Sequence, residues 1–194
     1  MDTSKRTTGP AKPSETYIHI NHDSMDRIIF LDFDGVLNTE KYQAELRGRR
    51  RSTVDTYGPK FDPEAVLNLQ KILHEVPNAK IVIESSWKLE GLQRIKDMWV
   101  SRELPGSIYD ITPDYLYGPV NINLETIDDF RMLVGKGNEI RQWLLENEPT
   151  GCNYVILDDV PDFLPEQDKH VILINPVTGL TAENADLAIR ILQS

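Results

Sequence analysis

The chain has 194 residues, of which 40% are hydrophobic and 27% are charged, and these values are typical of a globular protein with a single domain. Its formal net charge of −10 argues against broad, sequence-independent binding to nucleic acid or anionic membranes, but does not exclude a local basic site for a phosphate-bearing ligand. The only cysteine, Cys152, excludes an internal disulfide, and no apolar run is long enough to cross a membrane or to form a signal sequence. These features predict a soluble, cytoplasmic protein.

The N-terminal part of the chain differs in composition from the rest. Residues 1–24 are rich in Ser, Thr, Pro and charged residues without apolar periodicity, which predicts a flexible tail. From residue 25 to 194, short apolar runs alternate with helix-type patterns, and we expect one domain there. The β-branched, apolar runs predict buried strands at residues 27–33, 79–85, 153–159 and 170–175, with a weaker strand at 107–111.

Helices are predicted between these strands. One begins after Asp62, which is expected to be the N-cap because Pro63 and an acidic residue follow it. Further helices are predicted at residues 88–102, 137–146 and, with Thr181 as the N-cap, at the C-terminal end of the chain. The alternation predicts an α/β, doubly wound, mostly parallel Rossmann-like sheet.

Polar side chains gather where the predicted strands end. In open parallel sheets, ligands bind beyond the carboxyl ends of the strands. We expect four sets of polar groups at this edge: the carboxylates of Asp32 and Asp34, the hydroxyls of Ser85 and Ser86, the ammonium group of Lys136, and the carboxylates of Asp158 and Asp159. This combination of groups is suited to binding a phosphate and a metal ion.

The same residues carry a resemblance to a known family. LDFDGVLN resembles the first motif of the haloacid dehalogenase (HAD) superfamily, whose phosphatases have Asp-x-Asp-Gly after the first strand. The other three motifs of the superfamily also have counterparts in the same order. The strand that ends at Ser85 is similar to the second motif, Lys136 is similar to the third, and the Asp158-Asp159 pair is similar to the fourth. More narrowly, FLDFDGVLN, SSWK, GKGNEIRQWL, VILDD and NPVTGLT resemble the HAD domains of multi-module RNA-repair proteins. The resemblance covers about residues 27–192 and implies a HAD-like phosphatase.

The resemblance also implies a mechanism. Residues two apart in a strand point to the same side, so Asp32 and Asp34 can address one phosphoryl group. Asp32 would be the nucleophile that forms an aspartyl-phosphate, and Asp34 would be the general acid and base. Mg²⁺ is the expected cofactor, with the Asp32 and Asp158 carboxylates and the Asp34 carbonyl as its ligands.

Other residues are expected to support these groups. Asp159, or alternatively Asp162, would contact the metal through water. Ser85 and Lys136 would hold the phosphate, and Ser85 is preferred to Ser86 because it directly follows the apolar strand. Lys88 is the alternative to Lys136.

The substrate does not follow from the sequence. The interval between residues 38 and 61 is too short for a separate cap domain, so we expect little or no cap and an open site. An open site suits a nucleotide, a nucleic-acid end or another accessible phosphate. Arg47, Arg49, Arg50 and Arg51 lie in this interval, and they form either a solvated charge run or a loop that binds further phosphates.

Alternative functions stay open at this point. A dehalogenase would use the same nucleophile, although displacement of a halide needs no proton donor such as Asp34. A phosphotransferase would share all four motifs. A non-catalytic phosphate-binding or interaction domain would have the same fold, but the complete set of acidic residues argues against it.

Overall fold

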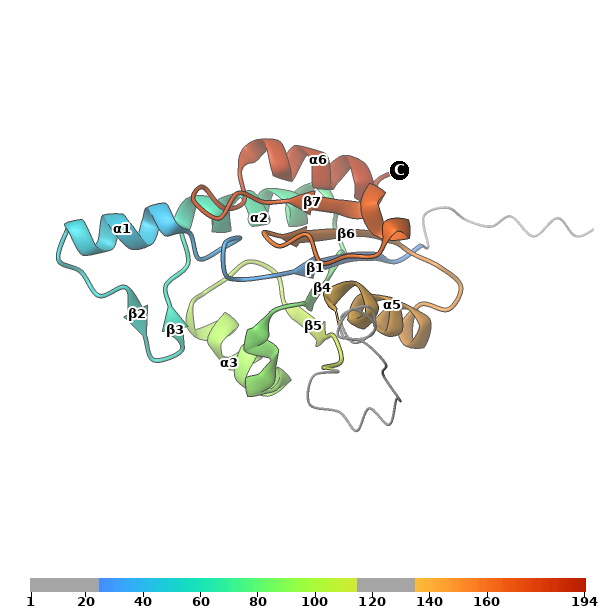
Figure 1. The fold of residues 1–194 in the computed structure, drawn as a ribbon, viewed down its shortest axis with the longest axis horizontal. Helices are drawn as coiled ribbons and strands as arrows, with labels where there is room; N and C mark the ends of the chain where they lie inside the picture. Colours follow the sequence, from blue (N-terminus) through green and yellow to red (C-terminus); the bar gives the residue numbers. More distant parts are fainter. Residues whose placement is uncertain (1–24, 115–134) are drawn as a thin grey trace, which may run out of the picture.

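The computed structural model describes residues 25–114 and 135–194, so the predicted N-terminal tail lies outside the described residues. The described part contains a five-stranded parallel sheet with the order β5-β4-β1-β6-β7 (Figure 1). The strands are β1 (Arg27–Leu31), β4 (Lys80–Ile83), β5 (Ile108–Ile111), β6 (Asn153–Asp158) and β7 (Val171–Leu173). All five predicted strands are therefore confirmed, and β1 lies at the centre of the sheet.

Helices cover both faces of this sheet, which explains why its strands are continuously apolar. Ile29 and Leu31 of β1 pack in a cluster with residues of α2 (Pro63–Glu75), α3 (Leu92–Ser101) and α6 (Ala182–Leu192). Ile28 and Phe30 point to the opposite face and pack in a cluster with α5 (Lys136–Asn147). The predicted α/β Rossmann-like architecture is confirmed.

The helix ends follow the local sequence. The side chain of Asp62 accepts a hydrogen bond from the Glu64 backbone N–H, and that of Thr181 accepts one from Asn184, as expected for N-caps. The helix predicted at residues 88–102 is confirmed as α3, but it begins later than expected, because a separate 3₁₀ helix, η2 (Ser86–Glu90), precedes α3. Gly91 separates them with φ +89, a left-handed conformation that favours glycine and interrupts a helix.

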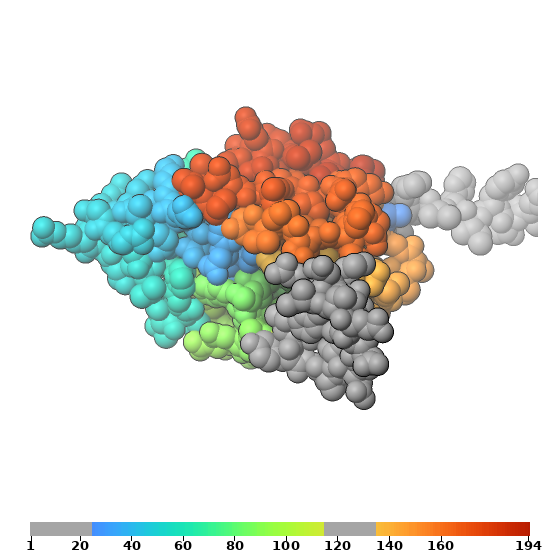
Figure 2. Space-filling model, in the orientation of Figure 1, coloured from blue at the N-terminus to red at the C-terminus, as the bar shows by residue number. Residues whose placement is uncertain are grey.

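The interval after the first motif is ordered, and our description of it as a loop is wrong. It contains α1 (Glu40–Gly48) and a short hairpin of β2 (Val54–Asp55) and β3 (Gly58–Pro59), which together form a small lobe beyond the strand ends (Figures 1 and 2). Thr39 caps α1 by accepting a hydrogen bond from the Tyr42 N–H. The lobe is far smaller than a domain.

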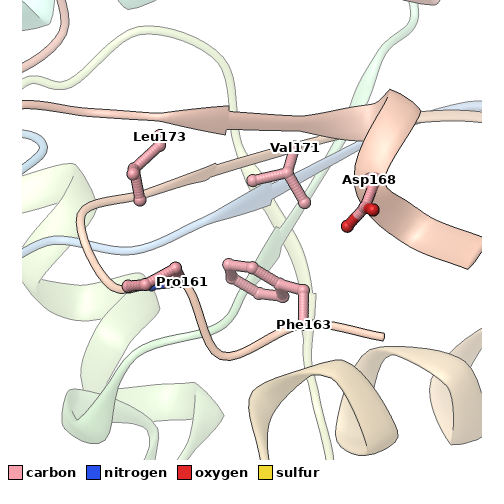
Figure 3. A pocket seen from close by; sticks show the side chains of 5 residues that line it. All are labelled: Pro161, Phe163, Asp168, Val171 and Leu173. Atoms are coloured by element: carbon pink, nitrogen blue, oxygen red, sulfur yellow. The ribbon is translucent and has the colours of Figure 1, made fainter. Parts of the chain in front are cut away.

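The edge of the sheet formed by β7 carries a separate surface hollow. It lies against β7 and is lined mostly by apolar side chains (Figure 3): Pro161, Phe163, Asp168, Val171 and Leu173. A 3₁₀ helix, η3 (Pro165–His170), leads into β7 beside it. None of the residues predicted to form the site lines this hollow. Within residues 25–114 and 135–194, every helix is too short or too polar to span a lipid bilayer.

Candidate active site

The first motif begins at the end of the central strand. The Asp32 N–H donates to the Leu157 carbonyl of β6, so the strand pairing extends to Asp32. The Asp32 side chain is buried, whereas Asp34 is exposed. Gly35 has φ +71, and a Cβ atom there would lie 2.3 Å from Oδ2 of Asp159. Glycine is therefore required both for the turn and for the close approach of Asp159.

Lys136 links the first and fourth motifs. It is the first residue of α5, and its Nζ lies 2.7 Å from Oδ2 of Asp32 and 2.6 Å from Oδ2 of Asp158. Burial alone would lower the pKa of Lys136, but the charges of Asp32 and Asp158 outweigh burial and raise it. Lys136 is therefore a fixed cation between two carboxylates at the strand ends.

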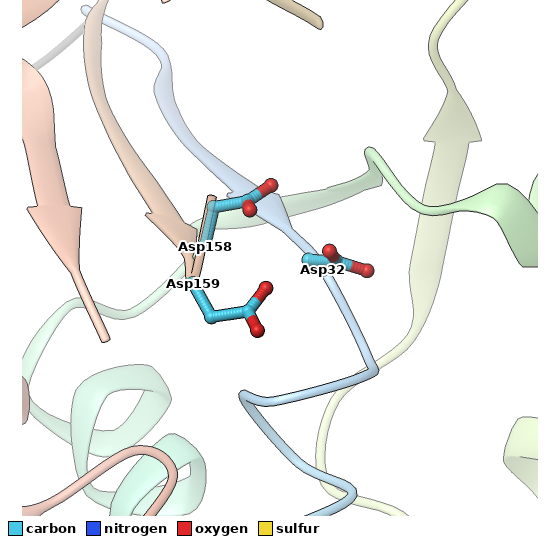
Figure 4. A group of neighbouring side chains, drawn as sticks. All are labelled: Asp32, Asp158 and Asp159. Carbon is cyan, nitrogen blue, oxygen red and sulfur yellow. The ribbon is translucent and has the colours of Figure 1, made fainter. Parts of the chain in front are cut away.

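Three carboxylates converge beside this ammonium group. Asp32, Asp158 and Asp159 can each place one oxygen within 4.8 Å of the others (Figure 4). Burial, together with the charge of Asp32, raises the pKa of Asp158 to about 7, and burial also raises the pKa of Asp159. Hard carboxylate oxygens with surplus negative charge are the donors that Mg²⁺ prefers, so these residues fit a divalent cation.

Asp162 has a different position from Asp159. Its carboxylate accepts a hydrogen bond from the Lys136 backbone N–H at 3.2 Å, which places it at the N-terminus of α5. Asp162 is not part of the three-carboxylate group. Asp159 is therefore the better placed of the two residues that we considered for the outer contact to a metal.

The two serines of the second motif have different environments. Ser85 is buried, and its Oγ has no hydrogen-bond partner among the described residues. Ser86 is exposed and begins η2. A buried hydroxyl without a partner is costly, and a ligand at this strand end would satisfy it. The contrast favours Ser85 over Ser86 as a phosphate contact.

Lys88 lies in a buried polar cluster. Its Nζ contacts Glu139 of α5 at 2.5 Å, Thr112 at 2.9 Å and Glu84 at 3.2 Å. Burial raises the pKa of Glu84 to about 8, despite the opposing effect of Lys88. The Lys88 ammonium is therefore already bound by three side chains of this cluster. The Lys136 ammonium instead contacts Asp32 and Asp158 of the first and fourth motifs. Sequence reasoning missed this cluster, because its members come from separate elements.

Asp34 is held by residues that the sequence did not single out. Its Oδ1 accepts from Nδ2 of Asn38 at 2.7 Å, and its Oδ2 accepts from the indole Nε1 of Trp87 at 3.0 Å. The Oδ1 of Asn38 in turn accepts from Nε2 of Gln43 at 2.7 Å. Trp87 also packs against Phe33 at the ring-centroid distance of 5.4 Å, so it has a packing role as well. Donors on both oxygens fix the orientation of the carboxylate.

This arrangement defines a class of protein. A parallel sheet whose central strand ends in Asp-x-Asp, facing a helix-borne lysine and a second acidic pair, is the architecture of the HAD superfamily. The family model described as "HAD domain in Swiss Army Knife RNA repair proteins" matches residues 28–185, and the chain belongs to this family. Comparisons with curated proteins and with solved structures gave no significant match.

Proposed function

We propose that the protein is a Mg²⁺-dependent phosphomonoester hydrolase that acts through an aspartyl-phosphate intermediate. The observation that carries the proposal is the convergence of the Asp32, Asp158 and Asp159 carboxylates at the strand ends, with Nζ of Lys136 bridging Asp32 and Asp158. Phosphoryl transfer requires a nucleophile, an acid/base, a cation and a group of metal ligands, and this site at the strand ends has a candidate for each.

The residues have distinct roles in this proposal. An Oδ atom of Asp32 attacks phosphorus and forms the acyl-phosphate bond, while the ester oxygen leaves with a proton from Asp34. Asp34, now ionised, takes a proton from the water that attacks phosphorus, and cleavage of the acyl-phosphate bond regenerates Asp32. Lys136 and the Ser85 hydroxyl hold the non-bridging oxygens and stabilise the negative charge of the transition state.

The acidic site requires a cation in addition to Lys136. The Asp32 and Asp158 carboxylates and the Asp34 carbonyl would hold Mg²⁺, with Asp159 as an outer contact. When bound, the ion supplies positive charge that offsets the repulsion between the carboxylates and a phosphate. Lys136 already neutralises part of this repulsion through its contacts to Asp32 and Asp158.

The proposed substrate is an accessible phosphate on a nucleotide or a nucleic-acid end. The small lobe of α1 and the β2–β3 hairpin leaves an open pocket beside Asp34, which supports a substrate that needs no enclosure. The family is described as the HAD domain of RNA repair proteins, which favours a nucleic-acid end over a sugar phosphate. A non-catalytic domain is disfavoured because the chain retains every ionisable group of the mechanism.

A phosphatase panel tests the proposal. Nucleotides, 3′- and 5′-phosphorylated oligonucleotides, sugar phosphates and an aryl phosphate are incubated with wild-type protein and Mg²⁺, and inorganic phosphate is measured. We expect hydrolysis that stops on chelation, resumes on addition of Mg²⁺, and is abolished in Asp32→Asn although the variant stays folded. Undiminished hydrolysis by Asp32→Asn would exclude the aspartyl-phosphate mechanism.

A further inference from the structure

An open pocket of about 460 Å³ extends from the Asp34 carboxylate along α1. Its polar lining includes the carboxylates of Asp34, Glu40 and Asp159, the amides of Asn38 and Gln43, and the guanidinium group of Arg47 from the last turn of α1. The volume falls within the range of about 300–1,000 Å³ that is usual for ligand sites. Because Asp34 is the proposed proton donor to the ester oxygen, the group that leaves with this oxygen departs into this pocket.

The geometry of α1 sets the distance between the two ends of the pocket. Thr39, Gln43 and Arg47 are four residues apart and all line the pocket, as expected for residues on one side of a helix. A rise of about 1.5 Å per residue places Arg47 about 12 Å along the axis from Thr39. The pocket therefore extends along about two turns of α1, which is longer than a single phosphate.

Arg47 has its donors available. Its side chain is exposed, and within residues 25–114 and 135–194 no carboxylate lies within ion-pair distance of it. The neighbouring Arg49 differs, because it pairs with Glu45 at 3.6 Å. Arg50 and Arg51 do not line the pocket. Of the four arginines in the interval after the first motif, only Arg47 is placed to meet a ligand in the pocket.

We propose that this pocket binds the leaving group of a phosphorylated oligonucleotide end, and that Arg47 binds its first internucleotide phosphate. The inference rests on the proposed phosphatase function and specifies its substrate. The guanidinium group offers a fork of donors that matches phosphate oxygens. A single phosphate contact also agrees with the acidic character of the rest of the chain.

The test compares substrates that differ only in the second phosphate. Two terminally phosphorylated dinucleotides are used, one with a natural phosphodiester and one with an uncharged methylphosphonate linkage. We expect the wild-type protein to prefer the charged dinucleotide by about tenfold in kcat/KM, the value of one charge-assisted contact. Arg47→Gln should reduce this preference to about one, and should lower the salt slope by about 0.7.

Arg49→Gln is the matched control, because it removes an equal charge two residues away that is already paired with Glu45. It should keep the preference for the charged dinucleotide. A wild-type protein without this preference, or a preference that survives Arg47→Gln, would overturn the proposal. The proposal would also be overturned if hydrolysis of a phosphopeptide with an acidic residue next to the phosphorylated one depended on Arg47 more strongly than hydrolysis of the dinucleotide does. The pocket would then bind a protein substrate.

A binding measurement separates failure of the subsite from failure of the proposed function. An aryl phosphate, which has no second phosphate, reports phosphatase activity alone, and its resistance to hydrolysis would contradict the proposed function. Fluorescence anisotropy then measures Kd for both dinucleotides with Asp32→Asn and with the double variant that also carries Arg47→Gln. A Kd ratio between the linkages that depends on Arg47 supports the subsite, and a ratio near one in both proteins contradicts it.

Discussion

Removal of the Lys136 ammonium by Lys136→Met tests how the site balances its charges. Methionine keeps most of the aliphatic stem but leaves Asp32 and Asp158 without their bridging cation, next to the third carboxylate, Asp159. The proposed Mg²⁺ site uses the same Asp32 and Asp158 carboxylates that Lys136 contacts. The variant should therefore be less stable without metal, but should bind Mg²⁺ more tightly than the wild-type protein does.

The magnitude follows from the contact distances. At 2.7 Å and an effective dielectric constant of about 20, each ion pair has a gross Coulomb energy of about 6 kcal/mol, most of which is offset by desolvation. Because the Lys136 side chain is 22% exposed, we expect a net loss of about 3 kcal/mol in the free energy of unfolding, at the lower end for broken buried pairs. For a chain of this size, this loss lowers Tm by about 6–12 °C.

Denaturant unfolding with and without Mg²⁺ measures both effects. A tenfold tighter Kd in Lys136→Met would add about 1.4 kcal/mol to the stabilisation by saturating Mg²⁺, while kcat should fall by about 10²–10³-fold. Lys80→Met is the matched control, because Lys80 also bridges two carboxylates, Asp26 and Glu148, and is 25% exposed. Its stability loss should not depend on Mg²⁺. If Lys136→Met binds Mg²⁺ no more tightly than the wild-type protein, the metal and Lys136 do not share carboxylates.

Three further predictions concern Asp34, Trp87 and Glu84. Asp34→Asn should lower kcat/KM, which reports formation of the aspartyl-phosphate, by about 10²–10⁴-fold for alkyl phosphates but less for aryl phosphates, whose leaving groups need little protonation; equal losses of kcat/KM in a leaving-group series would indicate a structural role. Trp87→Phe keeps the aromatic packing but removes the indole donor to Asp34, so it should slow hydrolysis of alkyl phosphates about three- to tenfold more than hydrolysis of aryl phosphates. Trp143→Phe is the control, because it removes an indole donor to Asp110 and should show no such bias in the same series. Glu84 binds a proton in the folded state up to pH about 8 but in the unfolded state only up to about 4.5, so its contribution to stability is complete below pH 4.5 and is lost as the pH rises to 8. In urea unfolding from pH 5 to 8, the wild-type protein should therefore lose up to about 1.4 kcal/mol per pH unit relative to Glu84→Gln, and parallel pH profiles would show that Glu84 is ionised in the folded protein.

The strand-end residues could be predicted because their positions depend on local patterns. A continuous apolar run predicts a buried strand, and parallel strands bring their carboxyl ends to one edge, so Asp32 and Asp158 were expected to meet. The N-caps Asp62 and Thr181 are equally local, since each bonds a backbone N–H within three residues.

The features that were missed depend on contacts between distant residues. The helix α1 buries only Leu46, so it lacks the apolar stripe by which a helix is recognised. Lys88 and Glu139 are 51 residues apart, and Trp87 and Asp34 are 53 apart, so no sequence spacing links the members of either pair. The tertiary fold, and not a local pattern, brings these side chains together.

The most direct test of the central claim is to detect a phosphoryl group on Asp32. An aryl phosphate needs little help from Asp34 to form the intermediate, whereas hydrolysis of the intermediate needs Asp34 as a base. Asp34→Asn mixed with an aryl phosphate and Mg²⁺ should therefore release a burst of one aryl alcohol per protein, and peptide mass spectrometry after acid quenching should find one phosphoryl group on Asp32. Slow turnover without a burst and without an adduct, or an adduct on another residue, would contradict Asp32 as the nucleophile.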